Sequence, residues 1–184
     1  MSLRDEILNV TMVLFREKGL HFTMNDVALR MHIAKKTIYK MYGSKEELMI
    51  DAVNHGFQRI YDEKQSIISS DLDITEKISR VLIAMPEDMA AMDWLMLKGL
   101  DEKYPEVSAL IRRHIESNWE PVIDLLRQGM DEGKIRNIDI QILRQIITVS
   151  IESFLGSDML IRNNISYQNA LETLADIIMK GIKV

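Results

Sequence analysis

The fold is decided by residues 22–48, which read FTMNDVALRMHIAKKTIYKMYGSKEEL. Thr23 with Asp26, and Ser44 with Glu47, have the spacing of a capping box. In this motif the hydroxyl side chain bonds a backbone amide of the first helical turn, and the acid three residues later bonds the amide of the capping residue. Helices are therefore predicted to begin directly after Thr23 and directly after Ser44.

Between these two starts the sequence leaves room for two short helices, over about residues 24–31 and 35–42, joined by residues 32–34. Two short helices joined by a turn of three to four residues have helix-turn-helix geometry, in which the second helix lies in the major groove of DNA. The small core between them is predicted to be Val27, Ala28, Ile33 and Ile38. The side chains that the second helix turns outward are then Lys35, Lys36, Thr37, Tyr39 and Lys40. These residue types bind phosphates and base edges.

Residues 22–28 and 37–48 resemble the DNA-binding region of the tetracycline-repressor (TetR) family, and the resemblance covers about residues 5–50. The order and lengths of the later helices are similar to the ligand-binding and dimerising domain of that family. The resemblance implies an all-helical homodimer that binds a near-palindromic DNA operator and releases it when a small molecule binds the larger domain. The DNA-contact positions of the family correspond here to Thr23, Lys35, Lys36, Thr37, Tyr39 and Lys45.

The sequence departs from the usual pattern of that family around the turn and at the end of the second helix. His32 stands where the turn commonly has glycine, although histidine adopts a positive φ more readily than most residues. Ala34 replaces a frequent serine and loses a hydroxyl contact to phosphate. Met41 stands where tyrosine or histidine often touches the DNA backbone, and Tyr42 takes the usual phenylalanine position. DNA binding is still expected, with the contacts of these positions left open.

Several of these residues also have a simpler structural role. Thr23 caps a helix whether or not it touches DNA, and Lys45 could be a first-turn lysine that water solvates. Tyr39 could pack against its neighbours, but it falls beside the lysines of a short amphipathic helix, so we expect a contact with DNA. Lys40 is expected to contribute at least to the local positive field.

Outside this motif the apolar residues recur at spacings of three and four, which indicates helices rather than strands. The predicted fold is all-α with about nine helices. It consists of a three-helix DNA-binding domain over residues 1–48 and a larger helical ligand-binding and dimerisation domain over residues 49–184. The later helices are predicted over about residues 45–65, 73–85, 105–131 with a kink at Pro121, 139–161 and 166–182. One more helix is predicted to begin at Pro86.

The composition is that of a soluble protein with a sizeable core. The chain has 184 residues, of which 47% are apolar, and it contains no cysteine. Disulfides, thiolate metal sites and thiol nucleophiles are therefore excluded. The sequence begins without the apolar run of a signal peptide, and no stretch approaches the roughly 18 apolar residues that span a bilayer. We expect a cytoplasmic protein with no membrane partner.

The formal net charge of −5 hides an asymmetry along the chain. Residues 1–50 carry 8 basic and 6 acidic side chains, whereas residues 51–184 have a net charge of −7. Residues 27–45 contain five basic side chains and no acidic one. A local positive field attracts a polyanion even when the whole protein is acidic. The charge therefore favours docking on DNA by the N-terminal region alone.

The larger domain holds a candidate ligand pocket. A methionine stripe is the usual content of a helical core, but methionine also adapts to varied apolar ligands. Asn118 is a polar amide on an apolar stripe, so it needs a partner, which could be a ligand, a water or nearby backbone. Glu152 could face a cationic ligand, but a position at a rim or interface is favoured. The candidate pocket residues are Met89, Met92, Met96, Asn118, Trp119 and Glu152. The expected effector is an apolar or amphipathic small molecule.

The last two predicted helices, over about residues 139–161 and 166–182, are rich in isoleucine and leucine. They could pack only within one subunit, but the resemblance implies that they form the four-helix interface of a homodimer. A single short recognition helix reads few base pairs, which also favours a dimer. The apolar side chains concerned are Ile142, Ile146, Val149, Phe154, Leu171, Leu174, Ile178 and Ile182.

The sequence contains no recognisable catalytic motif. The four histidines lack the spacing of metal ligands, and Gly129, Gly133 and Lys134 lack the spacing of a phosphate-binding loop. No enzyme activity, metal or cofactor is therefore predicted. The favoured function is a ligand-responsive DNA-binding transcriptional regulator, in particular a repressor. The alternative is an all-helical protein that binds small molecules without specific DNA recognition.

Overall fold

The computed structural model describes residues 2–90, 97, 99–155 and 157–184. Over these ranges it contains twelve α-helices and the short 3-10 turn η1, with no strand, so the predicted all-α class is confirmed. The described helices outnumber the roughly nine that were predicted. The elements are α1 (Leu3–Lys18), η1 (Gly19–His21), α2 (Met24–Arg30), α3 (Lys35–Met41), α4 (Lys45–Ser69), α5 (Ile74–Leu82), α6 (Glu87–Ala90), α7 (Leu100–Lys103), α8 (Pro105–Glu116), α9 (Glu120–Asp131), α10 (Ile140–Phe154), α11 (Asp158–Arg162) and α12 (Tyr167–Ile182). None of these helices is long and apolar enough to cross a membrane.

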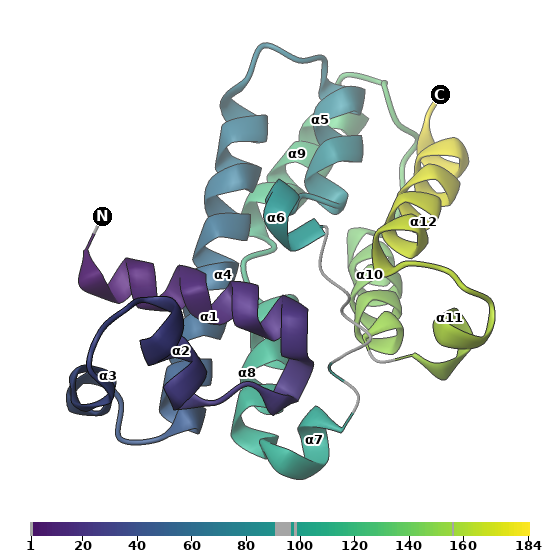
Figure 1. The fold of residues 1–184 in the computed structure, drawn as a ribbon. Helices are drawn as coiled ribbons and strands as arrows, with labels where there is room; N and C mark the ends of the chain where they lie inside the picture. Colours follow the sequence, from purple (N-terminus) through teal and green to yellow (C-terminus); the bar gives the residue numbers. More distant parts are fainter. Residues whose placement is uncertain (1, 91–96, 98, 156) are drawn as a thin grey trace.

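The first three helices form a small unit that we call the head (Figure 1). α1 begins with a capping box, in which the Ser2 hydroxyl accepts a hydrogen bond from the Asp5 amide at 3.2 Å and the Asp5 carboxylate accepts one from the Ser2 amide at 2.9 Å. α1 packs across α4 and against α2. The buried apolar side chains that hold these helices together include Ile7, Leu14, Phe22, Val27, Ile38 and Leu48.

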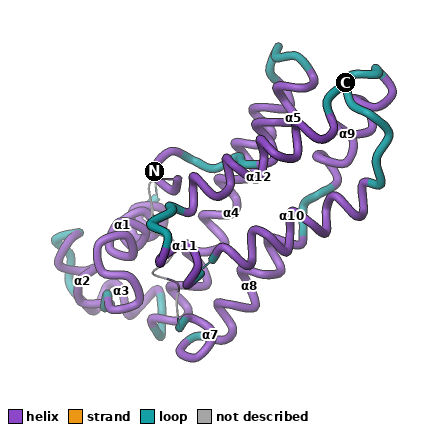
Figure 2. Tube along the Cα trace, turned by 90° about the vertical axis from the view of Figure 1, so that its right-hand side faces the viewer, coloured by secondary structure: helices purple, strands orange, loops and turns teal. Residues whose placement is uncertain are grey.

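α4 connects the head to the remaining helices, which we call the body. It has 25 residues and is therefore roughly 37 Å long. The apolar core of the head continues into Leu48, Met49 and Ala52 of α4, while α5 and α8 pack elsewhere along the same helix. Figure 2 shows the long helices of the body running away from the head. A displacement of α4 within the body therefore moves the head.

The predicted long helix over residues 105–131 is two helices in the structure. α8 ends at Glu116, and Asn118 adopts a left-handed backbone conformation with φ 59°. Pro121 then lies in the first turn of α9. Proline is accommodated there because the amide that it lacks has no helical partner in a first turn. The chain therefore breaks at residues 117–119 instead of bending at the proline, because asparagine tolerates the left-handed conformation better than most residues.

The other predicted boundaries differ where short polar segments cap a new helix. The predicted helix over residues 139–161 ends at Phe154, and the Ser157 hydroxyl then caps the short helix α11 by accepting a hydrogen bond from the Leu160 amide at 3.4 Å. α4 continues to Ser69, beyond its predicted end at residue 65. α5 ends at Leu82, before the predicted end at residue 85.

The body has its own core around α5, α9, α10 and α12. α5 and α9 lie close together because Gly129 has no side chain: a Cβ atom there would lie only 2.9 Å from Cδ1 of Ile78. Ile78, Val81, Leu126 and Ile147 are almost completely buried in this cluster. The core of the head and the core of the body are therefore separate clusters joined by α4 and α8.

Candidate DNA-binding helix-turn-helix and ligand cavity

Local hydrogen bonds fix the angle between α2 and α3. The Thr23 hydroxyl accepts a hydrogen bond from the Asp26 amide at 3.1 Å, and the Asp26 carboxylate accepts one from the Thr23 amide at 2.7 Å, so the predicted capping box of α2 is confirmed. His32 has φ 55°, the left-handed conformation that a glycine at this position would adopt easily. The Ile33 amide then donates to the Ala28 carbonyl at 3.0 Å. α2, the turn and α3 therefore form a helix-turn-helix.

The buried face of α3 leaves its basic face in solvent. Ile38 is fully buried against Val27 and Ala28, as predicted, and Ile33 is partly buried. The opposite face exposes Lys35, Lys36, Tyr39 and Lys40, with Thr37 partly exposed. The Lys35 ammonium lies 5.4 Å from the centroid of the Tyr39 ring, which is 45% exposed. Five of the six predicted DNA contacts, counting the exposed cap Thr23, thus lie on the outside of the head.

The positive charge of this surface comes from fewer residues than the sequence indicates. The Arg30 guanidinium pairs with Glu17 of α1, and its Nη1 donates to that carboxylate at 3.1 Å. No carboxylate among the described residues forms an ion pair with Lys35, Lys36 or Lys40. These three lysines of α3 are therefore the cations that remain free for a polyanion.

The sixth predicted DNA contact, Lys45, is turned into the protein. Its ammonium donates to the Leu20 carbonyl at 2.6 Å and lies 4.3 Å from the centroid of the Phe22 ring. The ring of Tyr104, at the start of α8, is 5.3 Å away on the body side. Burial lowers the pKa of the Lys45 ammonium below its usual range. A direct contact between this ammonium and phosphate would require it to leave the Leu20 carbonyl.

Lys45→Ala is expected to lower the free energy of unfolding by about 1–2 kcal/mol, because a charge-assisted hydrogen bond and a cation–π contact are lost. Urea denaturation measures this change. Lys40→Ala is the matched control, since the exposed Lys40 has no ion pair among the described residues and its removal should change stability by less than about 0.5 kcal/mol. An unchanged stability together with a flatter salt dependence of DNA binding would instead make Lys45 a phosphate contact.

The junction of α3 and α4 contains contacts that the sequence pattern does not reveal. The Ser44 hydroxyl caps α4 by accepting a hydrogen bond from the Glu47 amide at 3.1 Å, but the Glu47 carboxylate bonds the Gly43 amide at 2.7 Å, so only half of the predicted capping box forms. The Tyr42 hydroxyl donates to Asp51 of α4 at 2.7 Å. Burial, and then this hydrogen bond, raise the pKa of the Tyr42 hydroxyl.

Asp51 also receives a hydrogen bond from Nε of Arg4 at 2.9 Å, so one carboxylate of α4 joins the start of α1 to the end of α3. These contacts make the head a rigid unit on the first turns of α4. Neither the apolar spacing nor the capping pattern contains a signal for this network, because its hydrogen bonds join residues 47 and 9 positions apart in different elements.

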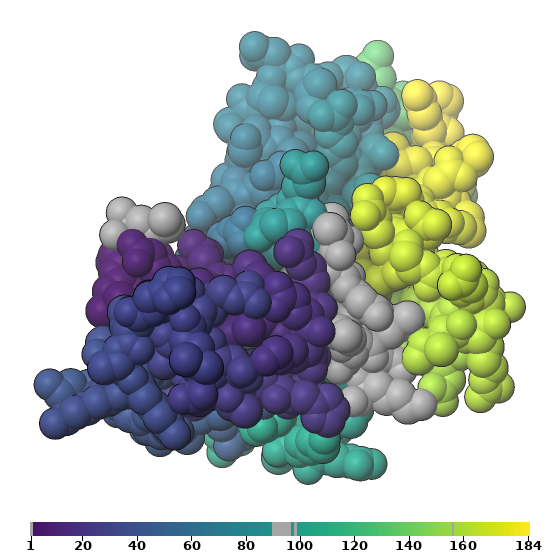
Figure 3. Space-filling model, viewed as in Figure 1, coloured from purple at the N-terminus to yellow at the C-terminus, as the bar shows by residue number. Residues whose placement is uncertain are grey.

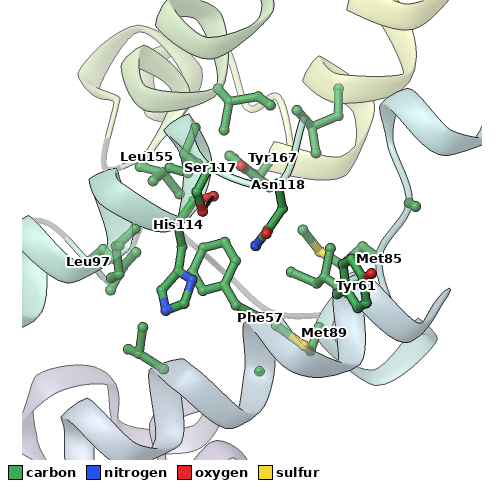
Figure 4. A pocket seen from close by; sticks show the side chains of 18 of the residues that line it. Phe57, Tyr61, Met85, Met89, Leu97, His114, Ser117, Asn118, Leu155 and Tyr167 are labelled. Carbon is green, nitrogen blue, oxygen red and sulfur yellow. Dashed lines mark hydrogen bonds between the residues drawn. The ribbon is translucent and has the colours of Figure 1, made fainter. Parts of the chain in front are cut away.

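A cavity of about 170 Å³ lies between the head and the body. α4, the α5–α6 connection, the α8–α9 break, α10 and α12 form its walls, and apolar side chains dominate the lining. Figure 4 shows Phe57, Met85, Met89 and Leu155 around this space, with the Asn118 side chain pointing into it from the α8–α9 break. Sites for small organic molecules typically combine an apolar lining with a few polar groups. The cavity is therefore a candidate ligand site.

The predicted pocket residues divide into three groups. Met89, Asn118 and Trp119 line the cavity, and the Trp119 indole donates to the Ile115 carbonyl at 3.0 Å. Met92 and Met96 lie outside the described residues. Glu152 lines a smaller neighbouring cavity of about 90 Å³ with Asp101, Ser108 and Arg112, and one of its carboxylate oxygens is buried without a hydrogen-bond partner among the described residues. The structure thus separates Glu152 from Met89, Asn118 and Trp119.

The cavity also includes residues that the sequence pattern did not single out. Thr11, Met12 and Phe15 of α1, with Phe22 before α2, form the wall on the side of the head. On the opposite side, the α4 residue Gly56 allows Met89 to approach, because a Cβ atom at position 56 would lie 3.2 Å from the methyl group of Met89. A molecule in the cavity would therefore touch the head and the body together.

A helix-turn-helix head with three free lysines on its second helix, attached to a helical body around an apolar cavity, defines a helix-turn-helix DNA-binding transcriptional regulator. Comparison with known proteins agrees, since residues 7–52 match the family model for bacterial regulatory proteins of the tetR family. These residues therefore form a DNA-binding domain of the TetR family of transcriptional regulators.

Two relatives resemble the chain along almost its whole length. It is 26% identical over 177 residues to the uncharacterized HTH-type transcriptional regulator YvaF of Bacillus subtilis, with 96% of this chain and 93% of that protein covered. It is 25% identical over 195 residues to the HTH-type transcriptional repressor KstR2 of Mycobacterium tuberculosis, with 98% and 96% covered.

A solved structure extends this likeness to three dimensions. The putative transcriptional regulator from Saccharomonospora viridis, solved in complex with choline, superposes with a TM-score of 0.74 at 18% identity and covers 98% of this chain and 97% of its own. At this identity the likeness shows the fold alone.

Proposed function

We propose that the protein is a repressor that binds a near-palindromic operator as a homodimer and releases it when a small molecule occupies the cavity. Residues 1–48 would serve as the DNA-binding domain, and residues 49–184 as the ligand-binding and dimerisation domain. The observation that carries the proposal is the exposure of Lys35, Lys36 and Tyr39 on one face of α3 while its other face is buried. The relative KstR2 is named as a repressor, which supports repression over activation.

In the proposed complex α3 enters the major groove. Lys35 and Lys36 contact phosphates or guanine acceptors, and Thr37 and Tyr39 contact phosphates or thymine methyl groups. Thr23 lies at the N-terminus of α2, where its hydroxyl reaches a phosphate on the edge of the same groove. Lys45 is the weakest member of the predicted set, because its ammonium is held by the Leu20 carbonyl. Binding to chromosomal DNA implies action in the cytoplasm.

The proposed dimer forms through α10 and α12. Ile142, Ile146 and Val149 of α10 are 59%, 50% and 50% exposed, and Ile177 of α12 is 63% exposed. We call these four residues the apolar face. A contiguous exposed apolar patch marks an interaction site on a soluble protein. Of the α12 residues that the sequence indicated, Leu171, Ile178 and Ile182 are buried within the subunit. In the proposed dimer they would hold α12 in place and would not contact the partner subunit.

Release of DNA is proposed to follow from the position of the cavity. Its walls include Met12 and Phe15 of α1 as well as residues of α4, so a ligand contacts both parts of the hinge between head and body. A ligand shifts the population only if it prefers one of two conformations. The preferred one would hold the two copies of α3 at a spacing other than the roughly 34–36 Å between successive major grooves. The choline complex of the S. viridis protein supports a small organic ligand for a protein of this fold.

The proposal is tested by titrating the full-length protein on DNA from upstream of its own gene at several salt concentrations. We expect tight binding at one near-palindrome, binding at least about 10³-fold weaker on scrambled DNA, and a steep negative salt slope. Micromolar affinity on every sequence would favour the alternative, a helical small-molecule binder without specific DNA recognition.

Tyr39→Ala is expected to reduce operator affinity by about 10- to 100-fold, because a contact to a base edge or phosphate is lost in both subunits. The same titration measures the change, and circular dichroism and mass measurements verify that helicity and dimer mass are retained. Lys134→Ala, at an exposed position between α9 and α10, serves as the control for a surface substitution. Unchanged operator affinity for the Tyr39 variant would remove this residue from the DNA contacts.

A further inference from the structure

Lys64 lines one end of the cavity. It is the last residue of a mostly apolar stripe of α4 residues that face the cavity. The residues that α4 contributes to the cavity recur at helical spacing and are Met49, Ala52, Val53, Gly56, Phe57, Ile60, Tyr61 and Lys64. From Met49 to Lys64 this stripe extends over roughly 22 Å of helix axis. Lys64 therefore places a cation at the far end of an elongated apolar channel, away from the head.

Lys64 has no charged partner among the described residues. Its neighbours at three and four positions along the helix are Ile60, Tyr61, Ile67 and Ile68, so α4 itself offers no carboxylate. Its ammonium lies 6.0 Å from the centroid of the Trp119 ring, which is 8% exposed. Burial lowers the pKa of Lys64, and no neighbouring charge opposes this effect. A partly buried ammonium without a counterion is costly, and an anion supplied from outside removes the cost.

A second hydrogen-bond donor, Asn118, lines the same cavity. Asn118 directly precedes Trp119, and its amide points into the cavity from the α8–α9 break (Figure 4). No described residue forms a hydrogen bond with the Asn118 side chain. Another polar group of the lining, His114, already has partners: its ring stacks on Phe57 at 4.4 Å between centroids, and its Nε2 lies 2.8 Å from the Asn54 amide oxygen.

We infer that the cavity binds an elongated apolar molecule that carries one anionic group, a carboxylate or a phosphate, and that Lys64 binds this group with Asn118 as a second donor. The apolar part then lies along the α4 stripe toward Phe57 and, beyond it, Phe15 and Phe22 of the head. This inference rests on the proposed function only in treating the cavity as the effector site. Glu152, the residue suited to a cationic ligand, lines the separate smaller cavity beside Arg112.

The test uses four probes with the same ten-carbon chain: decanoate, decyl phosphate, 1-decanol and decyltrimethylammonium. Each is titrated calorimetrically into the full-length protein below its micellar concentration. We expect at least one of the two anions to bind tenfold or more tightly than 1-decanol, with the quaternary ammonium weakest. The head-group that binds more tightly identifies the source of the negative charge as carboxylate or phosphate.

Three variants assign the preference to the Lys64 ammonium. Lys64→Met keeps an unbranched apolar side chain and should weaken anion binding tenfold or more while changing 1-decanol binding less than threefold. Lys64→Arg should retain the preference for anions. Lys134→Met, which removes an exposed lysine outside the cavity lining, should retain the wild-type order of affinities.

The inference is overturned if wild-type protein binds 1-decanol or decyltrimethylammonium as tightly as both anions, if none of the four probes binds, or if Lys64→Met keeps the anion preference. Operator binding by the wild-type protein is measured without any probe. A failure of operator binding would therefore reject the proposed repressor while the order of probe affinities still decides the anion site.

Discussion

Ile146→Glu is expected to convert the protein to a monomer at micromolar concentration and to lower operator affinity more than about hundredfold. Ile146 lies between Ile142 and Val149 on the exposed face of α10, and α10 packs against α12, which carries Ile177. In an isologous interface each substitution occurs twice, so two carboxylates would be buried against apolar side chains. Burying a charge without a partner costs several kcal/mol, which exceeds the contribution of a few apolar contacts.

The loss of the dimer removes DNA binding because one helix-turn-helix contacts only one half-site. Figure 3 shows the head and the last helices on opposite sides of the visible face, so the proposed DNA-binding surface lies apart from α12. Sedimentation velocity measures the mass, and operator titration measures the affinity. Arg127→Glu, which reverses a charge on the exposed side of α9, is the control and should remain dimeric. A dimeric Ile146 variant with full operator affinity would place the interface elsewhere.

The helix-turn-helix is predictable from sequence because its determinants are local. Thr23 and Asp26 are three residues apart, and their reciprocal hydrogen bonds form as the capping pattern predicts. The unusual His32 at the turn keeps the backbone conformation of the glycine that it replaces. A prediction from neighbouring residues succeeds here because the motif consists of contacts between residues close in the chain.

The break between α8 and α9 was not predictable in the same way. Pro121 is compatible with a kink inside a helix and with the first turn of a new one, and the sequence favoured the kink. Asn118 determines the outcome, because its left-handed backbone conformation ends the helix three residues before Pro121. This conformation also aims the Asn118 amide into the cavity. The polar residue singled out on an apolar stripe therefore lies at a break, not within a helix.

The surroundings of three lysines could not be predicted from the sequence. In the sequence Lys36 and Lys45 both match DNA-contact positions, whereas Lys64 looks like an ordinary residue of a helix surface. Lys36 is exposed on α3, the Lys45 ammonium is held by the Leu20 carbonyl, and Lys64 borders the cavity under Trp119. The difference comes from helices far apart in the chain: η1 beside the start of α4, and the α8–α9 break beside its end. Spacing along one helix contains no information about such contacts.

Replacing Lys35 and Lys36 together by alanine is expected to reduce operator affinity by about 10²–10³-fold near physiological salt. Both side chains are exposed and have no ion pair among the described residues, so each is free to neutralise a phosphate. A dimer presents four such lysines, and each phosphate contact contributes about 0.9 to the slope of log affinity against log salt. The slope should therefore become flatter by about three to four.

Titrations between about 50 and 200 mM salt measure this slope, over which a protein with several phosphate contacts loses orders of magnitude in affinity. The free energy of unfolding, measured by thermal denaturation, should change by less than about 0.5 kcal/mol, because both positions are on the surface. The control variant combines Lys134→Ala with Lys183→Ala and removes the same charge from exposed positions of the body. Comparing the two double variants distinguishes the loss of a phosphate contact from the effect of net charge. If the two double variants lose the same affinity and keep the same salt slope, α3 does not hold the phosphate contacts, and the lysines act only through net charge.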